Sequence, residues 1–154
     1  MKIDPTLDGI DHINIYSKGR TELGRMLSNF SYSPFTHPEY GSFTSIEGFW
    51  YWMKTGKKHD ALRTLYGFKA KDEGKKLDTV QCDEFNDEII EAIRCKLRQN
   101  RNILRLLTES SLPFEHYYWY GDIHNPKVYN LPQYKWMIDE IDRIRTICKE
   151  AWNK

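Results

Sequence analysis

The sequence predicts an α+β fold that is mainly α-helical, with a few short strands, in a single domain spanning residues 1–154. Two long segments, 86–108 and 133–152, carry apolar residues at helical spacing. Shorter apolar or aromatic runs, such as 10–16 and 114–120, have the length of single short strands. A chain of 154 residues without an internal repeat or a linker can bury one core.

The N-terminal part is predicted to hold short elements separated by turns. Residues 10–16 alternate imperfectly and predict a strand. Residues 17–26 contain two glycines and predict a loop, and the prolines and glycine within 34–41 predict turns before a short strand that ends at Phe43.

The next segment is predicted to be helical. Thr44 or Ser45 can cap a helix over 46–54. Residues 57–66 predict a second short helix, and the charged segment 69–76 fits either a helix or a loop.

The C-terminal half supplies the two strongest helix predictions. The helix over 86–108 has an acidic first turn and a basic later part, which complements the helix dipole. The helix over 133–152 follows Pro132, a residue suited to a helix entry. The aromatic run 114–120 between them predicts a buried strand or extended segment that ends at Gly121.

Composition narrows the class of protein. Charged residues make up 29% of the chain, mean hydropathy is -0.72, and no apolar run reaches the roughly 18 residues of a membrane span. The net charge of +1 gives no global attraction to nucleic acid or membrane.

Three widely spaced cysteines and the lack of an apolar leader segment predict a cytoplasmic protein with reduced thiols. The five histidines lack ligand spacing, so we expect no metal or other cofactor.

Glu47 is the most informative single residue. Aromatic and aliphatic residues surround it in the sequence, at Phe43, Ile46, Phe49, Trp50 and Trp52. A carboxylate in such surroundings is either a structural ion, here one that caps the first turn of a helix, or a catalytic group with a shifted pKa. The high aromatic content (five Trp, ten Tyr, seven Phe) likewise serves either a core or platforms that stack flat ligands.

An ordered set of short motifs resembles the NADAR family. The motifs span about residues 13–145 and are Leu27-Ser28-Asn29-Phe30, Ser45-x-Glu47, Gly67-x-x-Ala70-Lys71-x-x-Gly74, Lys96-Leu97-x-Gln99-Asn100, Leu104 to Thr108, Leu112-Pro113 and Trp119-Tyr120-Gly121. The chain departs from the family at Gly48, where His is frequent, in lacking the glutamine usual a little later, and around Gln81 and Cys82, where an Asp-Trp motif is usual.

The resemblance implies a YbiA-like fold and the hydrolysis of an N-glycosidic bond without a metal. The lead hypothesis is removal of ADP-ribose from a modified guanine in DNA or RNA. One alternative is an N-glycosidase acting on phosphorylated ribosylamine intermediates of the riboflavin pathway. Another is a non-catalytic module that binds ADP-ribose or a related nucleotide derived from NAD.

Roles follow for particular residues. Glu47 is the expected anion or base at the ribose carbon. Lys71 is expected to be its ionic partner, and the alternative role for Lys71 is an amine nucleophile that forms an imine with an opened ribose. Residues expected to contact the substrate are Asn29, Phe30, Arg20, Arg25, Trp50, Trp119 and Gly121. Each also has a structural interpretation, as a turn, core or solvated residue.

Four arginines form a stripe on the predicted helix 86–108. Arg94, Arg98, Arg101 and Arg105 lie at i, i+4, i+7 and i+11, a single helical face that could contact nucleic-acid phosphates. The simpler interpretation is a solvated face paired with Glu91 and Glu109.

Overall fold

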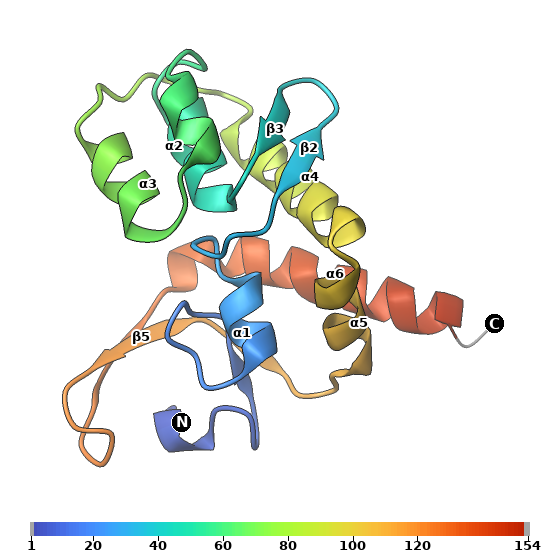
Figure 1. Cartoon of the computed structure of the whole chain (residues 1–154). Helices are drawn as coiled ribbons and strands as arrows, with labels where there is room; N and C mark the ends of the chain where they lie inside the picture. Colours follow the sequence, from blue (N-terminus) through green and yellow to red (C-terminus); the bar gives the residue numbers. More distant parts are fainter. Residues whose placement is uncertain (1, 153–154) are drawn as a thin grey trace. The chain divides into compact units, whose positions relative to one another are not determined.

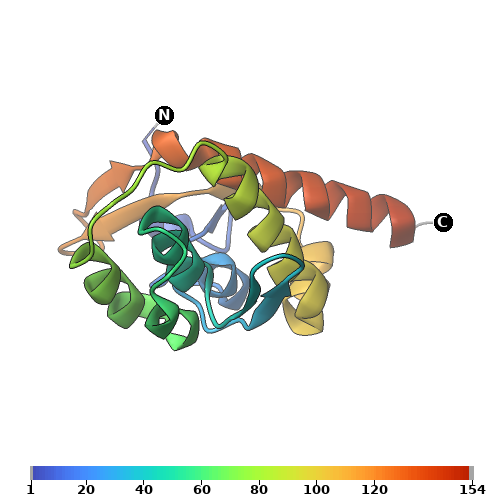
Figure 2. The same cartoon turned by 90° about the horizontal axis from the view of Figure 1, so that it is seen from above.

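The computed structural model describes residues 2–152, which fold as two compact units (Figures 1 and 2). The first unit combines the N-terminal segment up to Ser28 with the C-terminal segment from Arg105 onward, and the second is Asn29–Leu104. In the described residues the fold is mainly helical, with three two-stranded sheets. The predicted α+β class is therefore confirmed, whereas the prediction of a single domain remains a prediction.

The second unit is built around one antiparallel hairpin and three helices. Its elements are β2 (Phe35–His37), β3 (Gly41–Phe43), α2 (Ile46–Lys54), the 3-10 helix η2 (Asp60–Thr64), α3 (Gly67–Lys75) and α4 (Phe85–Gln99). The hairpin pairs Phe35 with Phe43. Phe49 of α2 is fully buried, and its ring meets that of Phe43 edge to face at 4.9 Å.

The first unit holds the remaining strands and the longest helix. Its elements are η1 (Pro5–Leu7), β1 (Ile13–Asn14), α1 (Glu22–Leu27), β4 (Phe114–Glu115), β5 (Tyr117–Tyr120), β6 (Lys127–Asn130), η3 (Pro132–Tyr134) and α6 (Lys135–Trp152). Strand β1 runs parallel to β4, and β5 and β6 form an antiparallel hairpin. The buried amide of Asn14 donates to the carbonyl of Tyr117 (3.0 Å) and accepts from its N–H (3.1 Å), which anchors β5.

Several element predictions are confirmed. Helix α2 spans the predicted residues 46–54 and is capped by Ser45. Helix α6 and the short strand that ends at Phe43 also form. The segment 69–76 resolves as helix α3. The predicted helix over 57–66 is shorter and is the 3-10 helix η2.

The predicted loop over 17–26 is correct for residues 17–21 and wrong from Glu22 onward, where α1 begins. Thr21 accepts a hydrogen bond from the Gly24 N–H and caps α1. A Cβ at Gly24 would lie 2.3 Å from the carbonyl oxygen of Asn14. The glycine therefore permits close packing of a helix and does not break one.

The single helix predicted over 86–108 is also wrong. It is divided into α4 and α5 (Arg101–Glu109), because Asn100 leaves helical geometry with φ -117° and ψ 88°. The Asn100 amide donates to the carbonyls of Lys96 (2.7 Å) and Pro34 (3.0 Å), which holds the break in place.

Within residues 2–152, no helix has both the length and the apolar character needed to cross a membrane.

Candidate functional site

Glu47 lies in the first turn of α2, and this turn is fixed from two sides. The Ser45 hydroxyl accepts a hydrogen bond from the Gly48 N–H (2.9 Å) and caps the helix. The N–H of Glu47 donates to the carbonyl of Asn29 (2.9 Å). The backbone that carries the carboxylate is thereby held by the segment that contains the Asn29-Phe30 motif.

Gly48, at the position where the NADAR family frequently has His, has no room for a side chain. A Cβ there would lie 2.5 Å from the Leu62 carbonyl oxygen and 3.0 Å from that of Leu65. The Leu65 oxygen also accepts hydrogen bonds from the Thr44 and Ser45 hydroxyls (3.0 and 2.9 Å). Because η2 and Leu65 pack directly on the start of α2, any side chain at residue 48 would push them away.

Burial raises the pKa of Glu47 to about 7, against opposing electrostatic effects of Lys71, Lys75 and Lys54. The side chain is half-buried. Within residues 2–152, none of these lysines forms an ion pair with the carboxylate, so they act as charges at a distance. Desolvation outweighs them, and the carboxyl is poised to exchange a proton near neutral pH.

Helix α3 brings the lysines to Glu47 by packing closely on α2. A Cβ at Gly74 would lie 2.1 Å from Cγ of Tyr51, and Ala70 is fully buried. Lys71 and Lys75 are one helical turn apart and share a face of α3. The Ala70-Lys71-x-x-Gly74 motif therefore combines two small packing residues with a lysine whose charge lowers the pKa of Glu47.

The Asn29-Phe30 motif joins the starts of α2 and α3. The Phe30 carbonyl accepts a hydrogen bond from the Gly67 N–H (3.0 Å), next to the Asn29 carbonyl that binds Glu47. Gly67 adopts φ +59°, a conformation that favours glycine. Four predicted site residues, Glu47, Lys71, Asn29 and Phe30, are thus brought together within one unit.

Trp50 has a different environment from the one expected of a stacking residue. Its ring is 9% exposed and meets Phe85 edge to face at 4.7 Å. The Lys54 ammonium lies 5.2 Å from its ring centre. This packing in the core leaves little indole surface for a ligand.

The other predicted substrate-binding residues belong to the first unit. The guanidinium groups of Arg20 and Arg25 donate to the carbonyls of Thr6 (2.7 Å) and Gly19 (2.9 Å). Trp119 is half-buried in β5, and Gly121 follows that strand with φ +89°. A substrate-binding role for Arg20, Arg25, Trp119 and Gly121 remains a prediction.

The arginine stripe is not a single helical face. The break at Asn100 places Arg94 and Arg98 on α4, and Arg101 and Arg105 on α5. Arg94 and Arg98 each lie 3.8 Å from Glu91, and Arg105 lies 3.3 Å from Glu109. These ion pairs match the simpler interpretation, and phosphate binding by the four arginines remains a prediction.

Lys54 and Lys75 were not among the residues singled out in the sequence. The sequence alone could have identified Lys75, because it lies four residues after Lys71 and therefore on the same face of a helix. No sequence pattern identifies Lys54, the last residue of α2, because its effect on the pKa of Glu47 depends on tertiary packing.

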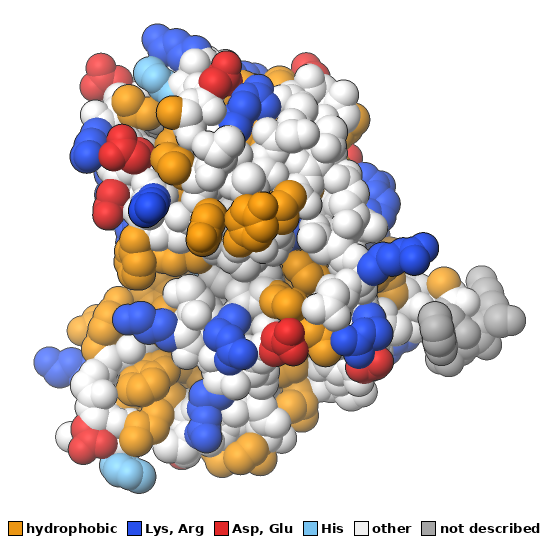
Figure 3. All heavy atoms as spheres, viewed as in Figure 1, with side chains coloured by type: hydrophobic (Ala, Val, Ile, Leu, Met, Phe, Trp, Pro, Cys, Tyr) orange, Lys and Arg blue, Asp and Glu red, His pale blue; other side chains and the backbone are white. Residues whose placement is uncertain are grey.

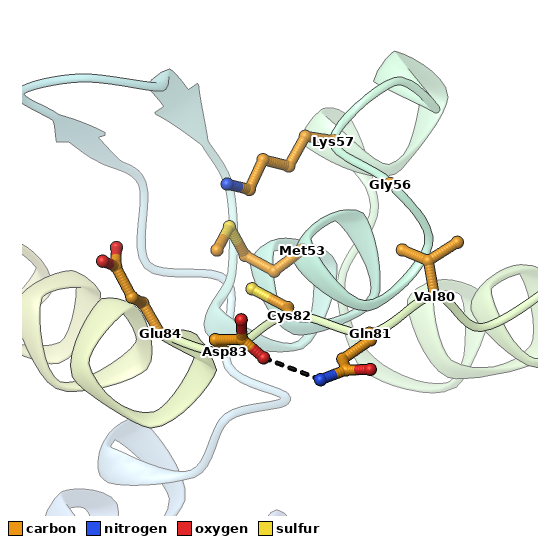
Figure 4. Close-up of a pocket in the computed structure, with 8 residues that line it drawn as sticks. All are labelled: Met53, Gly56, Lys57, Val80, Gln81, Cys82, Asp83 and Glu84. Carbon is orange, nitrogen blue, oxygen red and sulfur yellow. Dashed lines mark hydrogen bonds between the residues drawn. The ribbon is translucent and has the colours of Figure 1, made fainter.

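A separate hollow of about 440 Å³ lies in the same unit (Figure 4). Its lining residues are Met53, Gly56, Lys57, Val80, Gln81, Cys82, Asp83 and Glu84. The Lys57 ammonium donates to the Tyr40 hydroxyl (3.1 Å), and Gln81 donates to Asp83 (2.8 Å). Glu47 does not line this hollow, so the candidate site is a different part of the unit.

Comparison with protein-family models and with curated proteins gives no match. A search of solved structures matches the NMR structure of the E. coli protein YbiA, with a TM-score of 0.57 and 15% sequence identity over 92% of this chain and 84% of that chain. The chain has the YbiA fold. This likeness establishes the fold alone.

Proposed function

We propose that the protein is an N-glycosidase that hydrolyses the bond between C1 of a ribose and a nitrogen. The observation that carries this function is Glu47, a half-buried carboxyl whose pKa burial raises to about 7 although three lysines act electrostatically to lower it. Glycosidic hydrolysis requires a carboxyl group near the anomeric carbon, and pKa values shifted toward neutrality are typical of such acids and bases. The YbiA fold agrees with this chemistry.

In the proposed reaction, Glu47, the nearby lysines and Asn29 have separate roles. When the C1–N bond breaks, its electron pair leaves with the nitrogen, which takes up a proton from solvent, and positive charge develops on the ribose. The ionised Glu47 carboxylate stabilises this charge and accepts a proton from the water that attacks C1. The lysines near it, Lys71 above all, attract the phosphates of the substrate and help keep the carboxylate ionised. In this proposal the side-chain amide of Asn29 hydrogen-bonds a sugar hydroxyl.

The lead substrate is ADP-ribose attached to guanine in nucleic acid. Its diphosphate suits a site with three lysines near one carboxylate, and its scissile bond is of the required C1–N type. No metal or other cofactor takes part in this scheme.

A turnover assay tests this function. Wild type should release free ADP-ribose from an oligonucleotide that carries ADP-ribosylated guanine, and Glu47→Gln should lose at least about 100-fold in rate, the contribution of a general base. Glu39→Gln is the matched control, because Glu39 is an exposed glutamate of the same unit.

Other outcomes select other functions. Turnover of a phosphorylated ribosylaminopyrimidine alone would assign the site to small riboflavin-pathway substrates. No turnover, together with a higher melting temperature in ADP-ribose, would leave a binding module and contradict the enzyme.

A further inference from the structure

Three large aromatic side chains are exposed beside the candidate site. Tyr32, Tyr66 and Phe68 are 62%, 50% and 57% exposed. A contiguous exposed apolar patch often marks a binding surface, and these three rings lie in two short segments. Figure 3 shows hydrophobic side chains gathered on the face that carries the lower ends of α2 and α3.

The rings are arranged as two edge-to-face pairs. Tyr32 and Tyr66 lie 5.2 Å apart with an interplanar angle of 64°, and Phe30 and Phe68 lie 4.9 Å apart at 75°. In an edge-to-face pair the edge of one ring covers one face of the other, so each pair still offers its remaining ring faces to a ligand. The four residues form what we call the aromatic platform.

Backbone hydrogen bonds attach the platform to the first turn of α2. The Gly67 N–H, between Tyr66 and Phe68, donates to the Phe30 carbonyl (3.0 Å). One residue earlier, the Asn29 carbonyl accepts from the N–H of Glu47 (2.9 Å). These two bonds join the segments that carry the platform to the backbone of Glu47.

Helix α3, which begins at the platform, carries three lysines against the two acidic residues Asp72 and Glu73. The first turn of α3, which begins at Gly67, contains no acidic residue and is followed by Lys71. Lys69 in that turn is exposed, and Lys71 is half-buried. Flat exposed rings next to ammonium groups are the combination by which proteins bind unpaired bases and their phosphates.

Building on the N-glycosidase function above, we propose that the aromatic platform stacks unpaired bases next to the modified nucleotide. The substrate is then single-stranded nucleic acid, and Tyr32, Tyr66 and Phe68 are binding residues for the neighbouring nucleotides. A duplex keeps its bases stacked on one another and cannot use the platform.

Binding to an unmodified, labelled oligonucleotide of about 12 nucleotides tests this directly. Wild type should bind single-stranded DNA or RNA more tightly than the duplex of the same sequence. Tyr32→Ala, Tyr66→Ala and Phe68→Ala should each weaken single-strand binding about fivefold or more, the loss expected for one stacked base. Tyr32→Phe and Tyr66→Phe keep the ring and should bind as wild type does.

The variants are suited to this test because the side chains are exposed and Tyr66 provides no side-chain cap to α3. Tyr129→Ala is the matched control, since Tyr129 is 51% exposed and belongs to the other unit. Equal affinity for duplex and single strand, or no change on removing the rings, would overturn the platform. Self-association of wild type that the ring variants abolish, without oligonucleotide binding, would assign the surface to a second copy instead.

A second readout separates this inference from the proposed enzyme. Ring variants should release ADP-ribose from a modified oligonucleotide more slowly at low substrate concentration, yet hydrolyse ADP-ribosylated guanosine at the wild-type rate. Ring-dependent binding without any hydrolysis would reject the enzyme and retain the platform. Hydrolysis of both substrates without dependence on the rings would reject the platform and retain the enzyme.

Discussion

At the scale of single residues, two opposing effects set the pKa of Glu47: burial raises it, and nearby positive charges lower it. Lys71, Lys75 and Lys54 favour its ionised form, yet its pKa rises to about 7 because desolvation is larger. One pKa unit corresponds to about 1.4 kcal/mol, so ionising this carboxyl in the folded protein costs up to about 3 kcal/mol. The protein retains a destabilising group at the start of a helix, as expected of a functional site.

This cost makes stability depend on pH. The folded pKa lies above the unfolded value near 4.5, so the folded state holds the proton more tightly and loses stability as pH rises from about 4.5 to 7. Glu47→Gln removes the effect. The variant should therefore gain up to about 3 kcal/mol over wild type between pH 4.5 and 8, measured by urea unfolding. Glu39→Gln should follow wild type, and a constant difference between Glu47→Gln and wild type would contradict the raised pKa.

Lys71 should set the pH range of activity. Removing its positive charge in Lys71→Met raises the pKa of Glu47 further, so the inflection of kcat/KM should move to higher pH. Lys71→Arg preserves the charge and should preserve the profile, whereas an imine mechanism would lose activity in both variants. Lys76→Met is the control on the same segment, because Lys76 is exposed and pairs with Glu73. Borohydride trapping of a covalent adduct would establish the imine route instead.

At the scale of elements, the contact between α2 and α3 holds Lys71 near Glu47. Gly74→Ala should destabilise the protein by about 2–3 kcal/mol, because its Cβ would overlap the Tyr51 ring. In a Tyr51→Ala background the same change should cost little, since alanine is the better helix former. Thermal unfolding of wild type, the two single variants and the double variant gives the coupling free energy between residues 74 and 51. If the two substitutions have additive effects on stability, the contact between these residues does not limit helix packing.

Asn100 controls where α4 ends. Its amide donates to the carbonyls of Lys96 and Pro34, so Asn100→Ala should lose about 1–2 kcal/mol of stability. Asn86→Ala removes an exposed amide of the same helix and should change stability by less than about 0.5 kcal/mol. Urea unfolding compares the two, and equal effects would argue against the bridging role of Asn100.

The elements that the sequence predicted well are those with local signals. Ser45 and the following apolar residues located α2, and with it the position of Glu47 in a first turn. The failures involve contacts between distant residues. Gly24 was taken as a loop glycine because its packing against Asn14 is invisible in sequence, and the break at Asn100 depends on Pro34, 66 residues earlier.

At the scale of the whole molecule, the order of motifs predicted the fold better than any single motif did. The match to YbiA at 15% identity shows that this fold persists after most residues have changed. The structure brings together four residues that were selected from sequence, Glu47, Lys71, Asn29 and Phe30, and their functional roles remain predictions. The influence of Lys54, the packing need for Gly48 and the exposed rings of the platform could not be predicted from sequence, because each depends on how separate elements meet.

The most direct test is the pH dependence of kcat/KM for release of ADP-ribose from ADP-ribosylated guanine. If the ionisation of Glu47 governs cleavage of the C1–N bond, the rate should rise through an inflection near pH 7 in wild type, and Glu47→Gln should lose both the rate and the inflection. A Glu47→Gln variant that retains the wild-type rate and profile would contradict the account.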